Sequence, residues 1–125
     1  MNILELTGRI FLSMIFLVAG FGKIFSYEGT IGYMESYGIP GYLLIPAIII
    51  EILLPILVIV GYKTKLSSMI LALFAILLAI IFHTDFSNQM QLMAFLKNFA
   101  IAGGFLIISI KGSGKYSIDH RLNQN

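Results

Sequence analysis

The chain has 125 residues, of which 58% are apolar and 11% are charged, and its mean hydropathy is +0.95. Soluble domains carry about 25% charged residues, so this composition excludes a soluble domain and indicates a protein whose solvent is lipid. The absence of cysteine excludes disulfides, thiol redox chemistry and thiolate metal sites. The two histidines are too few to bind two haems at different depths with two histidine ligands each. The formal net charge of +2 points to membrane topology rather than to nucleic acid.

Four apolar runs are each about as long as a bilayer requires. They cover residues 6–25, 41–60, 66–82 and 91–110. The first run loosely fits a signal peptide, but no A-x-A site follows it, so we interpret it as a retained span. Spanning segments of this length satisfy their own backbone hydrogen bonds as helices. We therefore predict an all-α transmembrane four-helix bundle with short loops, formed by residues 1–125 as a single domain with a tail over 111–125.

Basic residues are concentrated on one side of the predicted bundle. If the four helices alternate in direction, this side holds Arg9, Lys63, Lys65, Lys111, Lys115 and Arg121. By the positive-inside rule, both termini are predicted to be cytoplasmic, and these residues are expected to be topology anchors in the headgroups rather than catalytic groups. The loop at 26–42 then faces outward, and the helical spacing of Ile31, Met34 and Tyr37 within it predicts a short interfacial helix.

Charged groups in the hydrocarbon are costly, so those inside the spans need an explanation. Glu51 lies about 15 Å from the outer start of the second span, near the midplane. Lys97 lies about 9 Å below the outer surface in the fourth span, with Asn98 beside it. Because the axial gap between Glu51 and Lys97 is about 6 Å, we expect them to form a buried pair. Lys23 and His83 lie higher, at the outer ends of the first and third spans.

Each of these residues also has a structural interpretation. Lys23 at a helix end can extend to the interface, His83 more often hydrogen-bonds there than binds a metal, and Asn98 can join helices. A buried ion pair adds little net stability, which favours a functional role for Glu51 and Lys97. The phenylalanines at the outer ends form either a pocket for a planar ligand or, as we favour, an aromatic rim: Phe21, Phe25, Phe82, Phe86, Phe95 and Phe99.

An ordered set of residues along most of the chain points to a known family. The set comprises Arg9, Gly20, Lys23, Glu51, Gly61, Thr64, His83, Lys97, Asn98 and the closing stretch from Gly112 to Asp119. From about residue 7 to residue 119 this pattern resembles the DoxX family. It departs from the family at Ser113, where a proline is common, and at Lys65, where an arginine is common.

The resemblance implies a multi-pass protein of the bacterial inner membrane, in a family often described as oxidoreductase-like, with some relatives linked to thiosulfate:quinone oxidoreduction and quinol oxidases. The sequence has no haem, flavin or metal signature, so a redox role requires a quinone or a separate redox subunit to carry the electrons. In that hypothesis Glu51 exchanges the quinone proton, Lys97 and Asn98 hydrogen-bond a ring oxygen, and His83 relays protons outward. The candidate catalytic residues are then Glu51, Lys97 and His83, and the candidate ligand contacts are Lys23, Glu51, Asn98, Phe95 and Phe99.

Two other classes of function stay open. A transporter of a small solute, or one coupled to protons, would use the same outward polar cavity and a kink at Pro55, with Glu51 binding a cation or a proton. It would need a homodimer, because one bundle of four helices is small for alternating access. A non-catalytic assembly subunit would instead stabilise a larger membrane complex through its glycine-containing faces and basic tail.

Overall fold

A computed structural model describes residues 2–114 and 117–122, and every regular element within those ranges is a helix. The elements are α1 (Asn2–Phe25), α2 (Tyr27–Ser36), the short 3-10 helix η1 (Gly41–Leu43), α3 (Leu44–Val60), α4 (Thr64–Phe82), α5 (Gln89–Lys111) and α6 (Ile118–Arg121). Four segments are long and apolar enough to cross a membrane: Ile3–Phe25, Gly41–Val60, Thr64–Phe82 and Gln89–Lys111. These segments confirm the predicted all-α class with four spans, and α2 is the short helix predicted between the first two spans.

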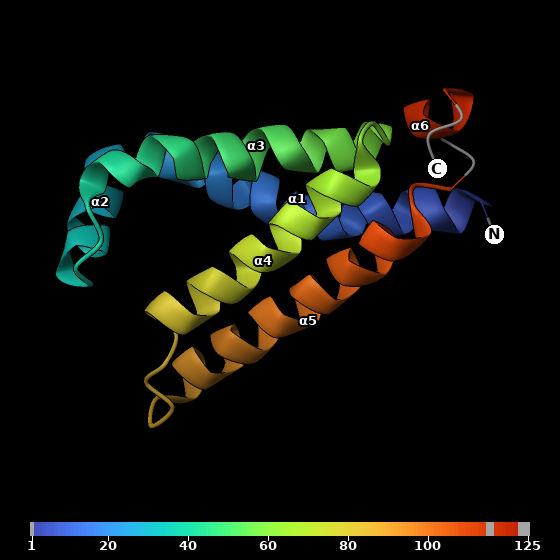
Figure 1. Ribbon diagram of the computed structural model, residues 1–125. Helices are drawn as coiled ribbons and strands as arrows, with labels where there is room; N and C mark the ends of the chain where they lie inside the picture. Colours follow the sequence, from blue (N-terminus) through green and yellow to red (C-terminus); the bar gives the residue numbers. More distant parts are fainter. Residues whose placement is uncertain (1, 115–116, 123–125) are drawn as a thin grey trace.

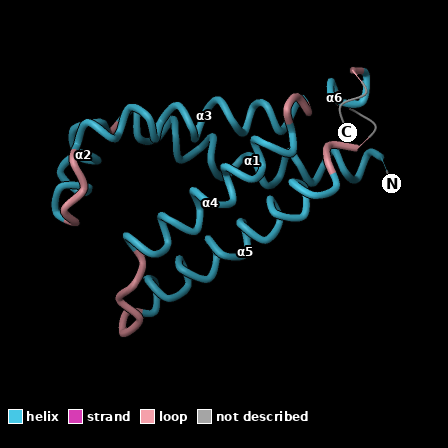
Figure 2. The backbone as a smooth tube through the Cα atoms, viewed as in Figure 1, coloured by secondary structure: helices cyan, strands magenta, loops and turns pink. Residues whose placement is uncertain are grey.

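The long helices form two antiparallel pairs that diverge from a common end. Helix α1 packs along α3, and α4 packs along α5. The pairs meet near the start of α1, the α3–α4 turn and α6, and they separate toward α2 and the α4–α5 loop (Figures 1 and 2). The two ends of the molecule therefore differ, because one is closed by contacts among all four long helices and the other is open.

The apolar core lies where the two pairs meet. Phe16 of α1 contacts Phe74 of α4 and Phe105 of α5, with ring centroids 6.2 and 5.8 Å apart. Gly104 of α5 allows this approach, because a Cβ at that position would lie 2.9 Å from the side chain of Leu12. This packing holds the two helix pairs together at the point from which they separate toward α2 and the α4–α5 loop.

The chain beyond α5 returns to the turn between α3 and α4. The carboxylate of Asp119 accepts hydrogen bonds from the backbone N–H groups of Lys63 and Thr64, at 2.9 and 2.8 Å. Gly61 has a φ of +75°, and a Cβ there would overlap Ser117. Burial alone would raise the pKa of Asp119, but hydrogen bonds from Thr64 and Lys63 outweigh it and hold the pKa below its ordinary value. The tail thus closes the turn as an ionised cap.

Arg9 is buried at this same end, with 2% of its surface exposed. Its Nη1 donates hydrogen bonds to the carbonyl oxygens of Val58 at 2.9 Å and Ile59 at 3.1 Å, in the last turn of α3, where intrahelical partners run out. Arg9 is predicted from its charge to lie in the headgroups, whereas in the structure it caps α3. Lys63, Lys65, Lys111 and Arg121 are exposed, and Lys115 lies outside the described residues.

Candidate functional site

Glu51 is buried midway along α3 and pairs with Lys23 of α1. The Lys23 Nζ lies 2.9 Å from Glu51 Oε1, and the two side chains are 27% and 1% exposed, respectively. The second carboxylate oxygen, Oε2, is buried and has no hydrogen-bond partner among the described residues. The ion pair therefore joins the first two long helices and leaves the lysine as its accessible member.

Gly20 brings α1 close to α3 at the level of this pair. A Cβ built on Gly20 would lie 2.7 Å from Cγ1 of Ile52 and 3.2 Å from Cβ of Glu51. One turn farther along, Pro55 lacks the N–H that would otherwise bond to the Glu51 carbonyl, although α3 continues through it. A small residue on one helix and a large acidic side chain on the other thus fit together at the ion pair.

The predicted partner of Glu51 is wrong. Lys97 is exposed on α5, and α5 packs mainly along α4 rather than α3. Asn98 is also on α5, partly buried and outside the cavity described next. The depth of a residue in the membrane predicts how high its side chain lies, but not which neighbouring helix the side chain faces. Lys97 and Glu51 are apart because α5 packs along α4 and not along α3.

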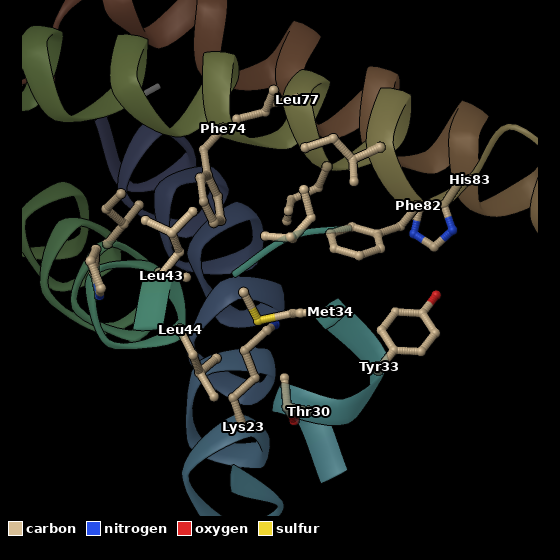
Figure 3. A pocket seen from close by; sticks show the side chains of 16 residues that line it. Lys23, Thr30, Tyr33, Met34, Leu43, Leu44, Phe74, Leu77, Phe82 and His83 are labelled. Carbon is tan, nitrogen blue, oxygen red and sulfur yellow. The ribbon is translucent and has the colours of Figure 1, made fainter. Parts of the chain in front are cut away.

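A cavity of about 420 Å³ lies between the diverging helix pairs, at the end of the molecule that holds α2. Side chains from α1, α2, α3 and α4 line it, and most of them are aliphatic or aromatic (Figure 3). Four lining residues carry polar groups, with Lys23 and Thr30 on one side of the cavity and Tyr33 and His83 on another. Lys23 is thus shared between the ion pair and the cavity, whereas Glu51 does not line it.

Three aromatic side chains connect α2 to α4 at the outer edge of the cavity. Phe82 contacts Tyr33 and Tyr37, with ring centroids 5.4 and 5.0 Å apart. Burial and the neighbouring Tyr37 raise the pKa of Tyr33 to about 12, so its hydroxyl stays neutral. These three ring contacts were not predicted from the sequence, although the spacing of four residues between the tyrosines already puts both rings on one face of a helix.

The other phenylalanines singled out from the sequence do not line the cavity. Phe86, Phe95 and Phe99 form a separate stack, with successive centroids 5.0 and 4.7 Å apart. Phe21 and Phe25 are exposed on α1. Of the six, only Phe82 reaches the cavity, and the ligand contacts expected at Phe95 and Phe99 are not assembled with Lys23.

His83 follows α4 at the edge of the cavity. Its Nδ1 lies 3.1 Å from Oε1 of Gln91, which holds the imidazole in place. Within residues 2–114 and 117–122, no three acidic, histidine or cysteine side chains form a cluster that could hold a metal ion. The contact with Gln91 thus positions His83 as a hydrogen-bonding group at the edge of the cavity.

The cavity lies within the part of the chain that matches a known protein family. The family model described as DoxX matches residues 4–84, a range that contains every residue lining the cavity and both members of the ion pair. Inner membrane protein YqjF of Escherichia coli is 40% identical, over 95% of this chain and 92% of that protein. Inner membrane protein YphA of the same organism is 33% identical, over 95% and 90%. No solved structure matches the chain.

Proposed function

This chain belongs to the DoxX family, and we propose that it is an inner-membrane subunit that binds a quinone in the cavity between its helix pairs. The cavity carries this proposal: it measures about 420 Å³, its walls are mainly apolar, and a lysine stands at its edge. Sites for small molecules characteristically combine a few hundred Å³ of apolar space with a small number of placed polar groups. The names of YqjF and YphA support the inner-membrane location.

Lys23 supplies the polar contact for the quinone. An ammonium group has three N–H donors, and one of them is directed at Glu51. The remaining donors serve a carbonyl oxygen of the ring, while the aromatic side chains of Phe74 and Phe82 supply part of the apolar wall. Glu51 acts through Lys23, holding the ammonium in position and exchanging a proton with it.

Reduction of a quinone takes up two electrons and two protons, and this chain can supply only the protons. The sequence has no cysteine and no flavin, nucleotide or haem motif, so a separate redox subunit delivers the electrons. His83 and Tyr33 border the cavity on a different side from Lys23, where they are placed to serve the second ring oxygen and the outer surface (Figure 3).

We further propose that both termini are cytoplasmic. The start of α1 and α6 lie at the same end of the bundle, where Lys63, Lys65 and Lys111 are exposed (Figure 1). A reporter that is active only in the periplasm, fused after the last residue, is expected to be inactive. Activity of that fusion would reverse the orientation and place the cavity in the inner leaflet.

The test of quinone binding is mass spectrometry of the quinones that co-purify with natively extracted protein. Wild type is expected to hold close to one quinone per chain, and Lys23→Met to hold only the bulk-lipid level. Lys97→Met is the matched control, because it removes the same charge from an exposed position outside the cavity. If folded wild-type protein holds quinone only at the bulk-lipid level, the proposal is overturned. A role in transport or in assembly would then be favoured.

A further inference from the structure

The cavity carries no net charge despite the lysine at its edge. Among the described residues that line it, Lys23 and His83 are the only basic ones and none is acidic, and Lys23 is already bonded to Glu51. The Lys23–Glu51 pair is neutral whether its shared proton resides on the nitrogen or on the oxygen. A ligand entering the cavity therefore meets hydrogen-bond donors but no uncompensated ammonium charge.

We propose that Glu51 determines which molecules this cavity accepts. By neutralising Lys23, it admits amphiphiles whose headgroup is a neutral acceptor, such as a ketone or an ester, and excludes amphiphilic anions such as fatty acids. The inference rests on the proposed function for the location of the site. It goes beyond the quinone by stating which headgroup charges the site accepts and which it excludes.

A neutral carbonyl and an anion make different demands on the ion pair. A carbonyl oxygen accepts one of the free N–H donors of Lys23 while the bond to Glu51 stays intact. A carboxylate would place a second anion on the same ammonium, inside walls that are mainly apolar and screen charge poorly. Like charges brought together in a binding site repel each other, so the anion is rejected.

Neither member of the pair has another way to accommodate an anion. Glu51 is held midway along α3, is 1% exposed, and packs against Gly20 of α1, so its carboxylate cannot turn to water. Two other basic residues of the long helices are placed elsewhere: Arg9 bonds to the last carbonyls of α3, and Lys97 is exposed on α5. Selectivity against anions thus depends on one carboxylate that does not touch the ligand.

The substitution Glu51→Gln keeps the shape of the side chain and its carbonyl acceptor but removes the compensating charge. Lys23 then presents an unpaired ammonium to the cavity, which favours a carboxylate headgroup over a neutral one. A purely structural role for Glu51 predicts weaker binding of every ligand in this variant, whereas charge selection predicts that one class of ligand binds more tightly.

The experiment measures binding of oleate, methyl oleate and decylubiquinone to the full chain by native mass spectrometry, at a pH where oleate is ionised. Wild type is expected to bind the two neutral probes, and to bind oleate at least about tenfold more weakly than its methyl ester. In Glu51→Gln the affinity for oleate is expected to rise at least about tenfold, and Lys23→Met in that background should abolish the gain. Lys97→Met is expected to match wild type.

Equal affinity of wild type for oleate and methyl oleate would overturn the inference, and this comparison needs no variant to fold. If methyl oleate is preferred but decylubiquinone does not bind, charge selection stands and the quinone proposal fails. If decylubiquinone binds without any discrimination between oleate and its ester, the quinone proposal stands and charge selection fails. Binding of none of the three overturns both.

Discussion

Lys23→Met is expected to destabilise the protein more than removing both charges of the pair does. Breaking a buried pair by removing one partner costs about 3–5 kcal/mol, because the other charge is left buried. Here Glu51 is 1% exposed but Lys23 is 27% exposed, so water already screens part of the attraction and we expect about 2–3 kcal/mol. In the double variant Lys23→Met/Glu51→Gln neither position carries a charge, so no unpaired charge is buried. The loss in free energy of unfolding should then fall to about 1–2 kcal/mol.

Reversible unfolding in mixed micelles, followed by circular dichroism, gives the free energy of unfolding for wild type, both single variants and the double variant. The coupling energy between the two positions should be at least about 1 kcal/mol. Lys97→Met is the control, and at its exposed position it should stay within about 0.5 kcal/mol of wild type. A Lys23→Met protein as stable as that control, or a double variant as unstable as the sum of the single ones, would refute the buried pair.

Three further outcomes follow from the structure. Gly61→Ala should lower the free energy of unfolding by about 2 kcal/mol or more, since it adds a Cβ at a φ of +75° and against Ser117; wild-type stability in the same unfolding assay would contradict this. Asp119 has a lower pKa in the folded chain than in the unfolded one, so the unfolded chain takes up the proton first and wild type should lose stability as the pH falls below about 4. Asp119→Asn should lack this acid-dependent loss in a pH series of unfolding curves. Phe82→Ala removes the ring between Tyr33 and Tyr37, so amide exchange in α2 should accelerate while α5 keeps the wild-type rate.

The helices could be predicted from sequence because lipid leaves a long apolar segment few alternatives. The four apolar runs and the four observed spans differ by at most three residues at any end. The helix over Tyr27–Ser36 followed from the spacing of Ile31 and Met34, which needs no knowledge of the rest of the fold. These helices could be predicted because apolar runs and helical spacing depend only on residues that are close together in the sequence.

The site could be predicted only in part, because its contacts depend on rotation about each helix axis. Glu51 was correctly singled out as a buried charge, but its partner is Lys23 rather than Lys97. The sequence places both lysines within reach by depth, and only the separation of α5 from α3 distinguishes them. Phe82 was assigned to a rim, and its partners, Tyr33 in α2 and Tyr37 just after it, became apparent only once the helices were placed in space.

The contacts at the closed end escaped prediction for a related reason. The charge of Arg9 alone predicts a residue that lies in the headgroups. Its burial depends on the carbonyl oxygen of Val58, and nothing in the sequence indicates that this group lies next to Arg9. Asp119 entered only as part of a family pattern. Its role is visible in the structure because two backbone N–H groups of a distant turn converge on it.

The cap supplied by Asp119 has a consequence for how the chain matures during synthesis. Its acceptor oxygens lie 55 and 56 residues downstream of the donors in the α3–α4 turn. The ribosome therefore releases all four spans into the membrane before the turn that joins the middle two can be completed. Until then the backbone N–H groups of Lys63 and Thr64 lack this acceptor, so a chain that ends before residue 119 is expected to leave the α3–α4 turn without its cap.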